Sequence, residues 1–335
     1  MLSEFKDRIL IFKESIKASI FNNPLLKNNS LGNAIIKDLG LKNVKRIFIG
    51  KPNTLIIITK KNILRMPLDR LSAIRCRVNK IMLKKTQKTN IANLTPRILQ
   101  EGEFQGKKYY CEEKLPGVAI GLPIKKMDEL VVKAADFITK FHQETAKDIT
   151  ITESNFKRLF GRDFERLNLY LNDEYREKLK TIKQNIKKQL IDKKFKTVWM
   201  HGDYKVENIL VNTKTWHIEG IIDWDLSGLE GLPLLDVFYL LIDKKGIMKR
   251  QQLLHVFCNG PISSKFSMLE QKIIDKYLGR LMISDQFIRP MLIMFWINTI
   301  TRRYRQQLID EHLQKDKWNY KHIYSVIDVI LQNNF

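Results

Sequence analysis

Residues 200–210 read Met-His-Gly-Asp-Tyr-Lys-Val-Glu-Asn-Ile-Leu, and residues 220–224 read Gly-Ile-Ile-Asp-Trp. The two stretches contain two carboxylates, Asp203 and Asp223, and one amide, Asn208. Asn208 follows Asp203 by five positions, so a tight loop can turn both side chains toward one point. The spacing therefore predicts a cluster of oxygen-bearing side chains on a short loop.

The residues around this loop predict a hairpin that brings the second carboxylate to the first. Residues 209–211 are apolar and indicate a short buried strand, and Asn212 is typical of the turn that follows. Residues 216–222 indicate the returning strand. A hairpin of these strands would place Asp223, at the end of the second, beside Asn208, at the start of the first.

This cluster has the chemistry that phosphoryl transfer needs. Transfer of a γ-phosphoryl group depends on a carboxylate at the acceptor hydroxyl and on oxygen ligands for Mg²⁺. Asp203 would orient the hydroxyl and accept its proton. Asn208 and Asp223 would ligate the metal, since Mg²⁺ prefers hard oxygen donors. The residues thus predict an ATP-dependent, magnesium-dependent kinase with Asp203 as its catalytic residue.

The motifs also resemble those of a known family. His201-Gly202-Asp203, Asn208, residues 222–224 and residues 231–236 are similar to the motifs of the aminoglycoside phosphotransferase and choline kinase family. The resemblance implies an α+β, bilobal, protein-kinase-like fold with ATP held between the lobes. The N-terminal lobe would be a small antiparallel sheet and the C-terminal lobe mainly helical. Family resemblance gives the chemistry but does not name the acceptor.

We expect the lobes to span residues 1–114 and residues 115–335. The first would combine a helical cap, over about residues 1–38, with the sheet that covers ATP, and the second would hold the catalytic loop and the acceptor site. Apolar residues at helical spacing, Ile9, Phe12, Ile16 and Ile20, support the helical cap.

Residues 46–59 read as strand, turn and strand, where a kinase has its phosphate-covering loop. Gly50 is the only glycine of this loop and is our candidate for a nucleotide contact. A simple hairpin turn explains Gly50 equally well.

Residues 62–67 indicate the next strand, in which Arg65 is the only cation. The resemblance implies that Arg65 meets the ATP phosphates, and arginine can hold phosphate oxygens in a bidentate way. A solvent-facing strand residue is the alternative. The helix expected over residues 71–83 has no glutamate to pair with this arginine, and Asn79 is the neutral polar group that could orient it. This departure leaves open a weak kinase, a different phosphate clamp, or a nucleotide-binding pseudokinase.

Two further strands are indicated by residues 95–100 and 107–112, and residues 114–117 break the pattern with Pro-Gly. The resemblance and this break imply that backbone groups around Cys111, Glu112 and Glu113 meet the adenine edge. Further along, we expect His142, at the end of an amphipathic helix, to be structural. We expect Asp236 to be structural too, as the cap that precedes a helix over residues 237–242.

A protein kinase is the main alternative to a small-molecule kinase. The loop from His201 resembles a protein-kinase catalytic loop, with Lys205 placed to touch the transferring phosphate. Gly202, however, replaces the arginine through which phosphorylated activation segments act. Only twelve residues separate Asp223 from Asp236, too few for a peptide-binding activation segment. A small hydroxyl compound, such as a sugar, is therefore favoured as the acceptor.

The chain has 59 Lys and Arg against 36 Asp and Glu, a net charge of +23. Residues 51–100 contain twelve Lys or Arg and one acid, Asp69. Such charge suits ATP, an anionic acceptor or peripheral contact with an acidic membrane, and it disfavours polycationic acceptors. A lysine-rich coding bias explains it equally well. Nucleic acid is an unlikely partner, because no nucleic-acid-binding motif accompanies the charge.

The C-terminal segment combines aromatic and basic residues. Aromatic rings at helical spacing favour a helical core over a cage for a quaternary ammonium group. The basic residues would suit an anionic acceptor. The residues concerned are Phe287, Phe295, Trp296, Tyr304 and Trp318, with Arg302, Arg303 and Arg305.

The composition predicts a cytoplasmic protein. The 44% hydrophobic content suits a folded domain, and the three cysteines, Cys76, Cys111 and Cys258, show no disulfide or metal-ligand spacing. The N-terminus lacks the apolar core of a signal peptide, and the longest C-terminal apolar run, residues 291–297, is too short to span a bilayer. We therefore expect no transmembrane segment.

Overall fold

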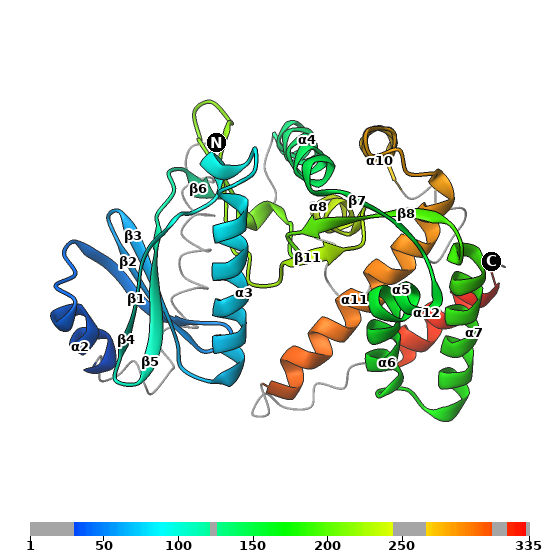
Figure 1. Ribbon diagram of the computed structural model, residues 1–335, viewed down its shortest axis with the longest axis horizontal. Helices are drawn as coiled ribbons and strands as arrows, with labels where there is room; N and C mark the ends of the chain where they lie inside the picture. The colour runs from blue at the N-terminus through cyan, green and yellow to red at the C-terminus, as the bar shows by residue number, and fades with distance from the viewer. Residues whose placement is uncertain (1–29, 121–125, 244–265, 310–319, 333–335) are drawn as a thin grey trace. The chain divides into compact units, whose positions relative to one another are not determined.

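The computed structural model describes residues 30–120, 126–243, 266–309 and 320–332 (Figure 1). These residues divide into two compact units. Unit 1 holds residues up to 120 together with His201–Gly228, and unit 2 holds the remaining described residues. The residues of the expected helical cap before Ser30 lie outside the described part of the chain.

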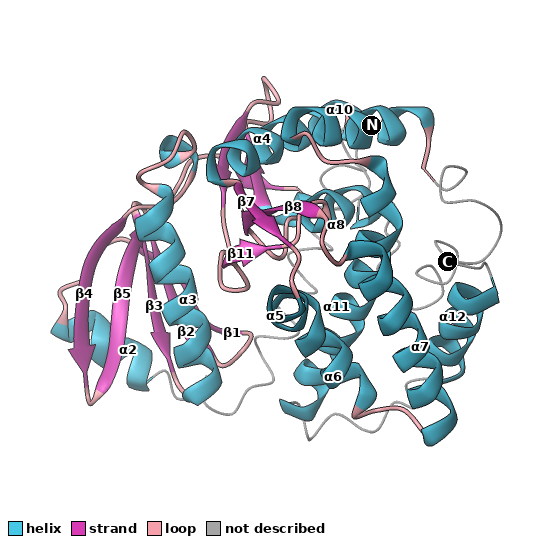
Figure 2. Cartoon of the chain, turned by 45° about the vertical axis from the view of Figure 1, so that its right-hand side comes forward, coloured by secondary structure: helices cyan, strands magenta, loops and turns pink. Residues whose placement is uncertain are grey.

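Unit 1 is built on a five-stranded antiparallel sheet with a helix on either face (Figure 2). The spatial order of its strands is β1-β2-β3-β5-β4, so β5 lies inside the sheet and β4 lies at its edge. The elements are α2 (Ser30–Asp38), β1 (Val44–Gly50), β2 (Thr54–Thr59), β3 (Asn62–Pro67), α3 (Arg70–Thr86), β4 (Ile98–Phe104) and β5 (Lys107–Glu113).

Strand alternation gives the two faces of this sheet different characters. On one face, Leu64 and Met66 of β3 and Cys111 of β5 are buried in an apolar cluster with Ile35 of α2. On the opposite face, toward α3, the alternate positions place Arg65 of β3, which is paired with Tyr110 of β5. The period of two therefore puts the single cation of β3 on the polar, α3-facing side.

Unit 1 also contains the predicted hairpin. Strand β9 (Ile209–Val211) pairs antiparallel with β10 (Ile218–Ile221), and β6 (Val118–Ala119) pairs with β9 on its other side. The short 3-10 helix η4 (Val206–Asn208) precedes β9. The expected strand, turn and returning strand are confirmed, with the second strand shorter than the sequence indicated.

Unit 2 is mainly helical and carries a small sheet of order β11-β8-β7. Helix α4 begins at Met127 and contacts both α8 and α10. The elements are α4 (Met127–Thr145), β7 (Lys147–Thr150), α5 (Glu153–Phe156), the π-helix η3 (Lys157–Gly161), α6 (Arg162–Asn168), α7 (Asp173–Leu190), β8 (Lys194–Met200), β11 (Gly228–Gly231), α8 (Leu235–Asp243), α10 (Met268–Leu281), α11 (Ile288–Ile309) and α12 (Tyr320–Gln332).

The aromatic residues of the C-terminal segment that can be placed belong to the core. Phe287, Phe295 and Trp296 are each at most 3% exposed, which confirms the core prediction for them. The guanidinium of Arg302 lies 5.5 Å from the ring centre of Tyr239, so this arginine stacks on the core. The other residues of the predicted set, Trp318 and the side chains of Arg303, Tyr304 and Arg305, lie outside the described part.

The predicted α+β class, with an antiparallel sheet followed by helices, is confirmed. The lobe boundary at residue 114 stays a prediction. Within the described residues, no helix is both long enough and apolar enough to cross a bilayer.

Candidate active site

Asp203 and Asn208 meet on the loop between β8 and β9, as the spacing predicts. The Nδ2 group of Asn208 donates to the backbone oxygen of Asp203 at 2.8 Å and to its Oδ2 at 3.2 Å. Asn208 is 6% exposed, whereas the side chain of Asp203 keeps 21% of its surface open. The amide thus holds the aspartate in place while one edge of the carboxylate stays accessible.

The hairpin brings Asp223 into the same neighbourhood. The backbone N–H of Ile222, the residue before Asp223, donates to the backbone oxygen of Asn208 at 3.0 Å. His201 ties the loop to the same strand end, because its Nε2–H donates to the oxygen of Ile222 at 3.0 Å. Its Nδ1 then accepts from the backbone N–H of Asp203 at 3.2 Å, which requires the neutral Nε2–H tautomer.

Two backbone positions at the site lie in the left-handed region. Gly202 has a φ of 82°, which an arginine at that position would adopt only with strain. Asp223 has a φ of 69°, and its side chain is 44% exposed. A non-glycine residue held at positive φ costs of order 1 kcal/mol or more, and such strain clusters at functional sites.

Lys205 supplies a cation beside the proposed catalytic carboxylate. Its Nζ lies 3.2 Å from Oδ2 of Asp203 and 3.7 Å from Oε2 of Glu207. The position agrees with the expectation that Lys205 is near the reacting groups; its contact with a phosphate stays a prediction.

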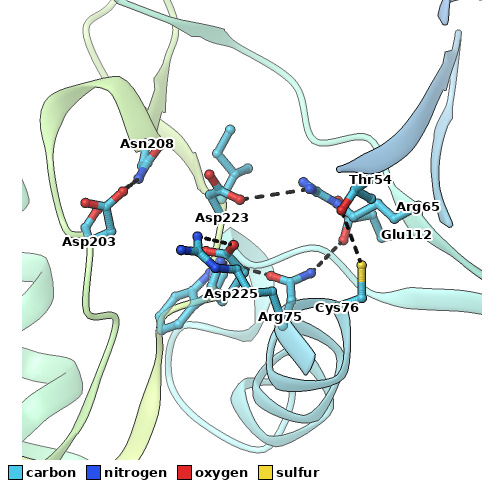
Figure 3. A network of polar contacts seen from close by, with 12 residues as sticks. Thr54, Arg65, Arg75, Cys76, Glu112, Asp203, Asn208, Asp223 and Asp225 are labelled. Carbon is cyan, nitrogen blue, oxygen red and sulfur yellow. Dashed lines mark hydrogen bonds and ion pairs between the residues drawn. The ribbon is translucent and has the colours of Figure 1, made fainter. Parts of the chain in front are cut away.

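Arg65 forms an ion pair that the sequence did not reveal. Its Nε–H donates to Oε1 of Glu112 at 2.8 Å, and its Nη1 lies 3.9 Å from Oδ1 of Asp223 (Figure 3). The Glu112 side chain is 3% exposed and that of Arg65 is 16% exposed. Burial alone would lower the pKa of Arg65, but the electrostatic effects of Glu112, Tyr110 and Asp223 together outweigh burial and raise this pKa well above its usual value. Arg65 is therefore a fixed cation facing Asp223, not a solvent-facing strand residue.

Asn79 of α3 joins this ion pair to the loop that carries Asp223. Its Nδ2 donates to the hydroxyl of Tyr110 at 2.7 Å and to Oε2 of Glu112 at 3.2 Å. Its Oδ1 accepts from the backbone N–H of Trp224 at 2.9 Å. Helix α3 has no glutamate, as expected, and Asn79 is connected to Arg65 through Glu112.

A second ion pair links α3 to the same loop. Nη1 of Arg75 lies 3.1 Å from Oδ2 of Asp225. Burial raises the pKa of Asp225 to about 6, and the nearby carboxylate of Asp223 adds to this rise. The loop after β10 thus carries two acidic residues two positions apart, each facing its own arginine.

Gly50 and Glu113 both lie close to other residues of the sheet in unit 1. A Cβ on Gly50 would lie 2.7 Å from Cδ1 of Ile56, so a larger residue there would have to displace the end of the Ile56 side chain. The carboxylate of Glu113 pairs with Nε of Arg97 at 2.9 Å, and its backbone N–H donates to the oxygen of Arg97. The nucleotide contacts predicted for Gly50, Glu112 and Glu113 stay predictions.

In unit 2, His142 and Asp236 are completely buried, as a structural role requires. Nδ1 of His142 lies 2.7 Å from the hydroxyl of Tyr277, and its Nε2 lies 3.3 Å from Oδ2 of Asp236. Asp236 lies inside α8, which begins at Leu235, so it links α8 to α4 and does not precede the helix as predicted.

The donor set around the hairpin fits magnesium. Mg²⁺ in phosphoryl-transfer sites takes one or two protein ligands and completes its shell with water and substrate phosphates. Asn208 uses its Nδ2 on Asp203, which directs its carbonyl Oδ1 elsewhere, and Asp223 contributes a half-exposed carboxylate. In the described part of the chain, no group of three or more His, Cys, Asp or Glu is arranged to hold a metal without a substrate.

Comparison with known proteins decides the family. A model described as the phosphotransferase enzyme family matches residues 59–261, more than half of the chain. The chain belongs to the phosphotransferase enzyme family. No curated protein matches this phosphotransferase closely enough to count as a relative.

Solved structures share its fold. The GDP complex of aminoglycoside 2'-phosphotransferase-IIIa is 14% identical, with a TM-score of 0.57, and the match covers 91% of this chain and 99% of that one. The enzyme APH(3'')-Id from Streptomyces rimosus, with ADP and streptomycin bound, is 15% identical, with a TM-score of 0.51 and coverage of 82% and 98%. This phosphotransferase therefore has the protein-kinase-like fold of the aminoglycoside phosphotransferases.

Proposed function

We propose that this phosphotransferase moves the γ-phosphoryl group of ATP to a hydroxyl group of a small molecule, with Mg²⁺ as its cofactor. The observation that carries the proposal is the double role of Asn208. Its side chain holds Asp203 and its backbone oxygen holds Ile222, the neighbour of Asp223. One residue thus connects the two carboxylates that phosphoryl transfer needs.

The proposed mechanism assigns one task to each group. The carboxylate of Asp203 accepts a hydrogen bond from the acceptor hydroxyl, orients its oxygen toward the γ-phosphorus and takes its proton as the bond to phosphorus forms. The hydrogen bonds from Asn208 keep this carboxylate in the attacking position. Arg65 and Lys205 offset charge on the phosphate oxygens, and ADP leaves with the electron pair of the broken bond.

Asn208 and Asp223 would hold Mg²⁺ through oxygen atoms. When bound, the ion supplies charge neutralisation on the phosphates and fixes their orientation. A carbonyl oxygen and a half-exposed carboxylate support this assignment.

A small-molecule acceptor is supported over a protein acceptor by Gly202 and by the short segment after the site. The φ of 82° at Gly202 disfavours the arginine that phosphorylated activation segments use. The twelve residues between Asp223 and Asp236 include β11 and leave no long peptide-binding segment. The pseudokinase alternative loses much of its basis, since Arg65 has a buried carboxylate partner.

For the acceptor we propose a neutral or anionic hydroxyl compound, such as a sugar, in the cytoplasm. The support is the net charge of +23 and the single acid among residues 51–100, which would repel a polycation. A series of neutral, anionic and polycationic hydroxyl compounds tests this class directly. Faster turnover of the polycations than of the other two groups would contradict the acceptor proposal.

The test of the function is a screen for phosphorylated products. The protein is incubated with ATP or GTP, Mg²⁺ and a metabolite extract, and mass spectrometry follows compounds that gain one phosphate. We expect such a compound with the unchanged protein and with the control Asp173→Asn, a surface carboxylate of unit 2 whose side chain is 96% exposed, but not with Asp203→Ala. A gain of phosphate on added proteins alone would favour a protein kinase. No transfer of phosphate to any compound would contradict the enzyme proposal.

A further inference from the structure

The guanidinium of Arg65 has two distinguishable edges. The Nε edge is used by Glu112 at 2.8 Å, and the Nη1 group faces Asp223 at 3.9 Å, beyond hydrogen-bond distance. A guanidinium has five N–H donors fixed in one plane, so one edge can hold Glu112 while the other edge is open to a second partner in a defined direction. The Nη1 edge of Arg65 therefore points toward the region where Asp223 would meet nucleotide phosphates.

We propose that Glu112 and Asn79 are positioning residues for Arg65, and that Glu112 supplies from strand β5 the carboxylate that many kinases supply from the helix. The proposal rests on the proposed function, in which Arg65 binds the phosphates. Neither residue would touch the phosphates in this arrangement; both act through the orientation of the guanidinium.

The burial of the pair argues against a purely stabilising role. A buried ion pair is weak evidence for stability, because taking two charges out of water costs about as much as their attraction returns. Two apolar side chains would fill positions 65 and 112 at least as well. Glu112 is 3% exposed, yet Arg65 keeps 16% of its side chain open, so the pair is buried on the carboxylate side and open on the arginine side. This asymmetry suits a cation whose buried edge is bound by Glu112 and whose open edge can bind a ligand.

Asn79 ties the position of Arg65 to that of Asp223. It donates to Glu112, which holds Arg65, and accepts from the backbone N–H of Trp224, the residue after Asp223. Asn79 is 2% exposed, and its hydrogen bonds to Tyr110, Glu112 and Trp224 are made to buried residues. The distance between the phosphate-binding cation and the metal-binding carboxylate is thus set by a short chain of buried hydrogen bonds.

Charge and geometry predict opposite results for Glu112→Gln. If Glu112 only balanced the charge of Arg65, its neutralisation would make the site more positive and would tighten the binding of a triphosphate. If Glu112 orients Arg65, the same change replaces a charge-assisted hydrogen bond by a weaker one, releases the guanidinium and weakens that binding. The sign of the change therefore separates the two roles.

The experiment compares a triphosphate with its nucleoside. Binding of a non-hydrolysable ATP analogue with Mg²⁺, and of adenosine alone, is measured by calorimetry for the unchanged protein and for Glu112→Gln. We expect the variant to bind the analogue on the order of tenfold more weakly and adenosine unchanged. Tighter or equal binding of the analogue overturns the proposal, as does an equal loss for both ligands, which would reveal a general structural role.

A matched control is Glu101→Gln. Glu101 lies on strand β4 of the same sheet and is ion-paired to Lys80 and Lys84 of α3, but it makes no contact with Arg65 in the described structure. Its replacement removes a carboxylate that links the sheet to the same helix. We expect both affinities to stay within about twofold of the unchanged protein, because surface ion pairs contribute little.

Glu112→Gln leaves Arg65 buried without a carboxylate and can prevent folding. The second variant, Arg65→Met with Glu112→Gln, removes both charges and is compared with Arg65→Met alone. If Glu112 acts only through Arg65, the two variants bind the analogue equally within about twofold, and both bind adenosine like the unchanged protein. A tenfold difference between them in analogue binding overturns the proposal.

The outcome for the unchanged protein distinguishes this inference from the proposed function. If the unchanged protein binds neither ATP nor GTP analogues, the proposed function fails and the inference fails with it. If it binds a triphosphate and the Glu112 variants bind equally well, only the positioning role is overturned.

Discussion

Two polar regions of unit 1 differ in how much of their surface they expose. Around Arg65, the carboxylate of Glu112 and the amide of Asn79 are almost completely buried and hydrogen-bonded to each other. On the hairpin loop, the side chains of Asp203 and Asp223 are 21% and 44% exposed. The comparison teaches that the groups which set positions are buried and hydrogen-bonded, whereas the two carboxylates assigned to the chemistry remain open to ligands.

This difference predicts that substitutions in the open region change activity and that substitutions in the buried region also change stability. Strain and like charges at functional sites often lower stability. The expected effects decrease from Asp223 through Asn79 and Arg65 to Asp136.

The largest effect is expected for Asp223→Asn. Loss of the metal-binding carboxylate should raise the activation free energy by several kcal/mol, which lowers kcat/KM on the order of a thousandfold. The stability of the variant should not fall, because asparagine tolerates the positive φ of 69° better than aspartate and no longer repels Asp225. Steady-state kinetics and the midpoint of thermal unfolding test both parts. A variant that is both inactive and strongly destabilised would contradict the account.

The second effect is a loss of stability in Asn79→Ala. The change leaves the N–H of Trp224 and one oxygen of Glu112 buried without Asn79, and it should lower the free energy of unfolding by about 3 kcal/mol. Denaturant unfolding of Asn79→Ala and of the unchanged protein measures this difference in the free energy of unfolding. A loss below about 1 kcal/mol would show that Asn79 is not central to the network.

The third effect separates arginine from lysine at position 65. In Arg65→Lys the ammonium group lacks the two planar edges of the guanidinium and cannot hold phosphate oxygens in a bidentate way, so the KM for ATP should rise on the order of tenfold, with a smaller change in kcat. Measured KM values for ATP at saturating acceptor decide this. An unchanged KM would mean that the Nη1 edge of the guanidinium does not bind the phosphates of ATP.

The smallest effect is expected at Asp136, on helix α4 of unit 2. Partial burial opposes ionisation of Asp136, but its bonds to Lys276 and Lys140 outweigh this and lower the pKa of Asp136 to about 2. A lowered pKa contributes stability above the unfolded value near 3.8, and this contribution is lost as the pH falls toward 2. Asp136→Asn should therefore cost about 1 kcal/mol at pH 7 and less at pH 3.

Denaturant unfolding at the two pH values checks this sign. Activity at pH 7 should be unchanged in Asp136→Asn. A difference in stability that grows as the pH falls would contradict the assigned direction of the pKa shift.

The sequence predicted those parts of the site that depend on local order. The hairpin of β9 and β10, the meeting of Asp203 with Asn208 and the boundaries of β3 follow from strand patterns and short spacings. Five residues of chain suffice to bring Asp203 to Asn208, so no knowledge of distant pairing is needed.

The role of Glu112 could not be predicted in the same way. Arg65 and Glu112 lie 47 positions apart and meet because β3 pairs with β5 in one particular register. A slip of one residue would turn Glu112 to the apolar face. One signal was present: Arg65 is the only charged residue of β3, and buried charges are usually paired. That signal predicts a carboxylate partner for Arg65, but it gives neither the partner, nor the register, nor the link through Asn79.

The central claim is that Asn208 and Asp223 bind nucleotide phosphates together with magnesium, and titration of ATP with and without Mg²⁺ tests it most directly. The account predicts that Mg²⁺ tightens ATP binding at least tenfold in the unchanged protein and has no effect in the double variant Asn208→Ala, Asp223→Asn. An equal gain from Mg²⁺ in that folded variant, or no gain in the unchanged protein, would contradict the account.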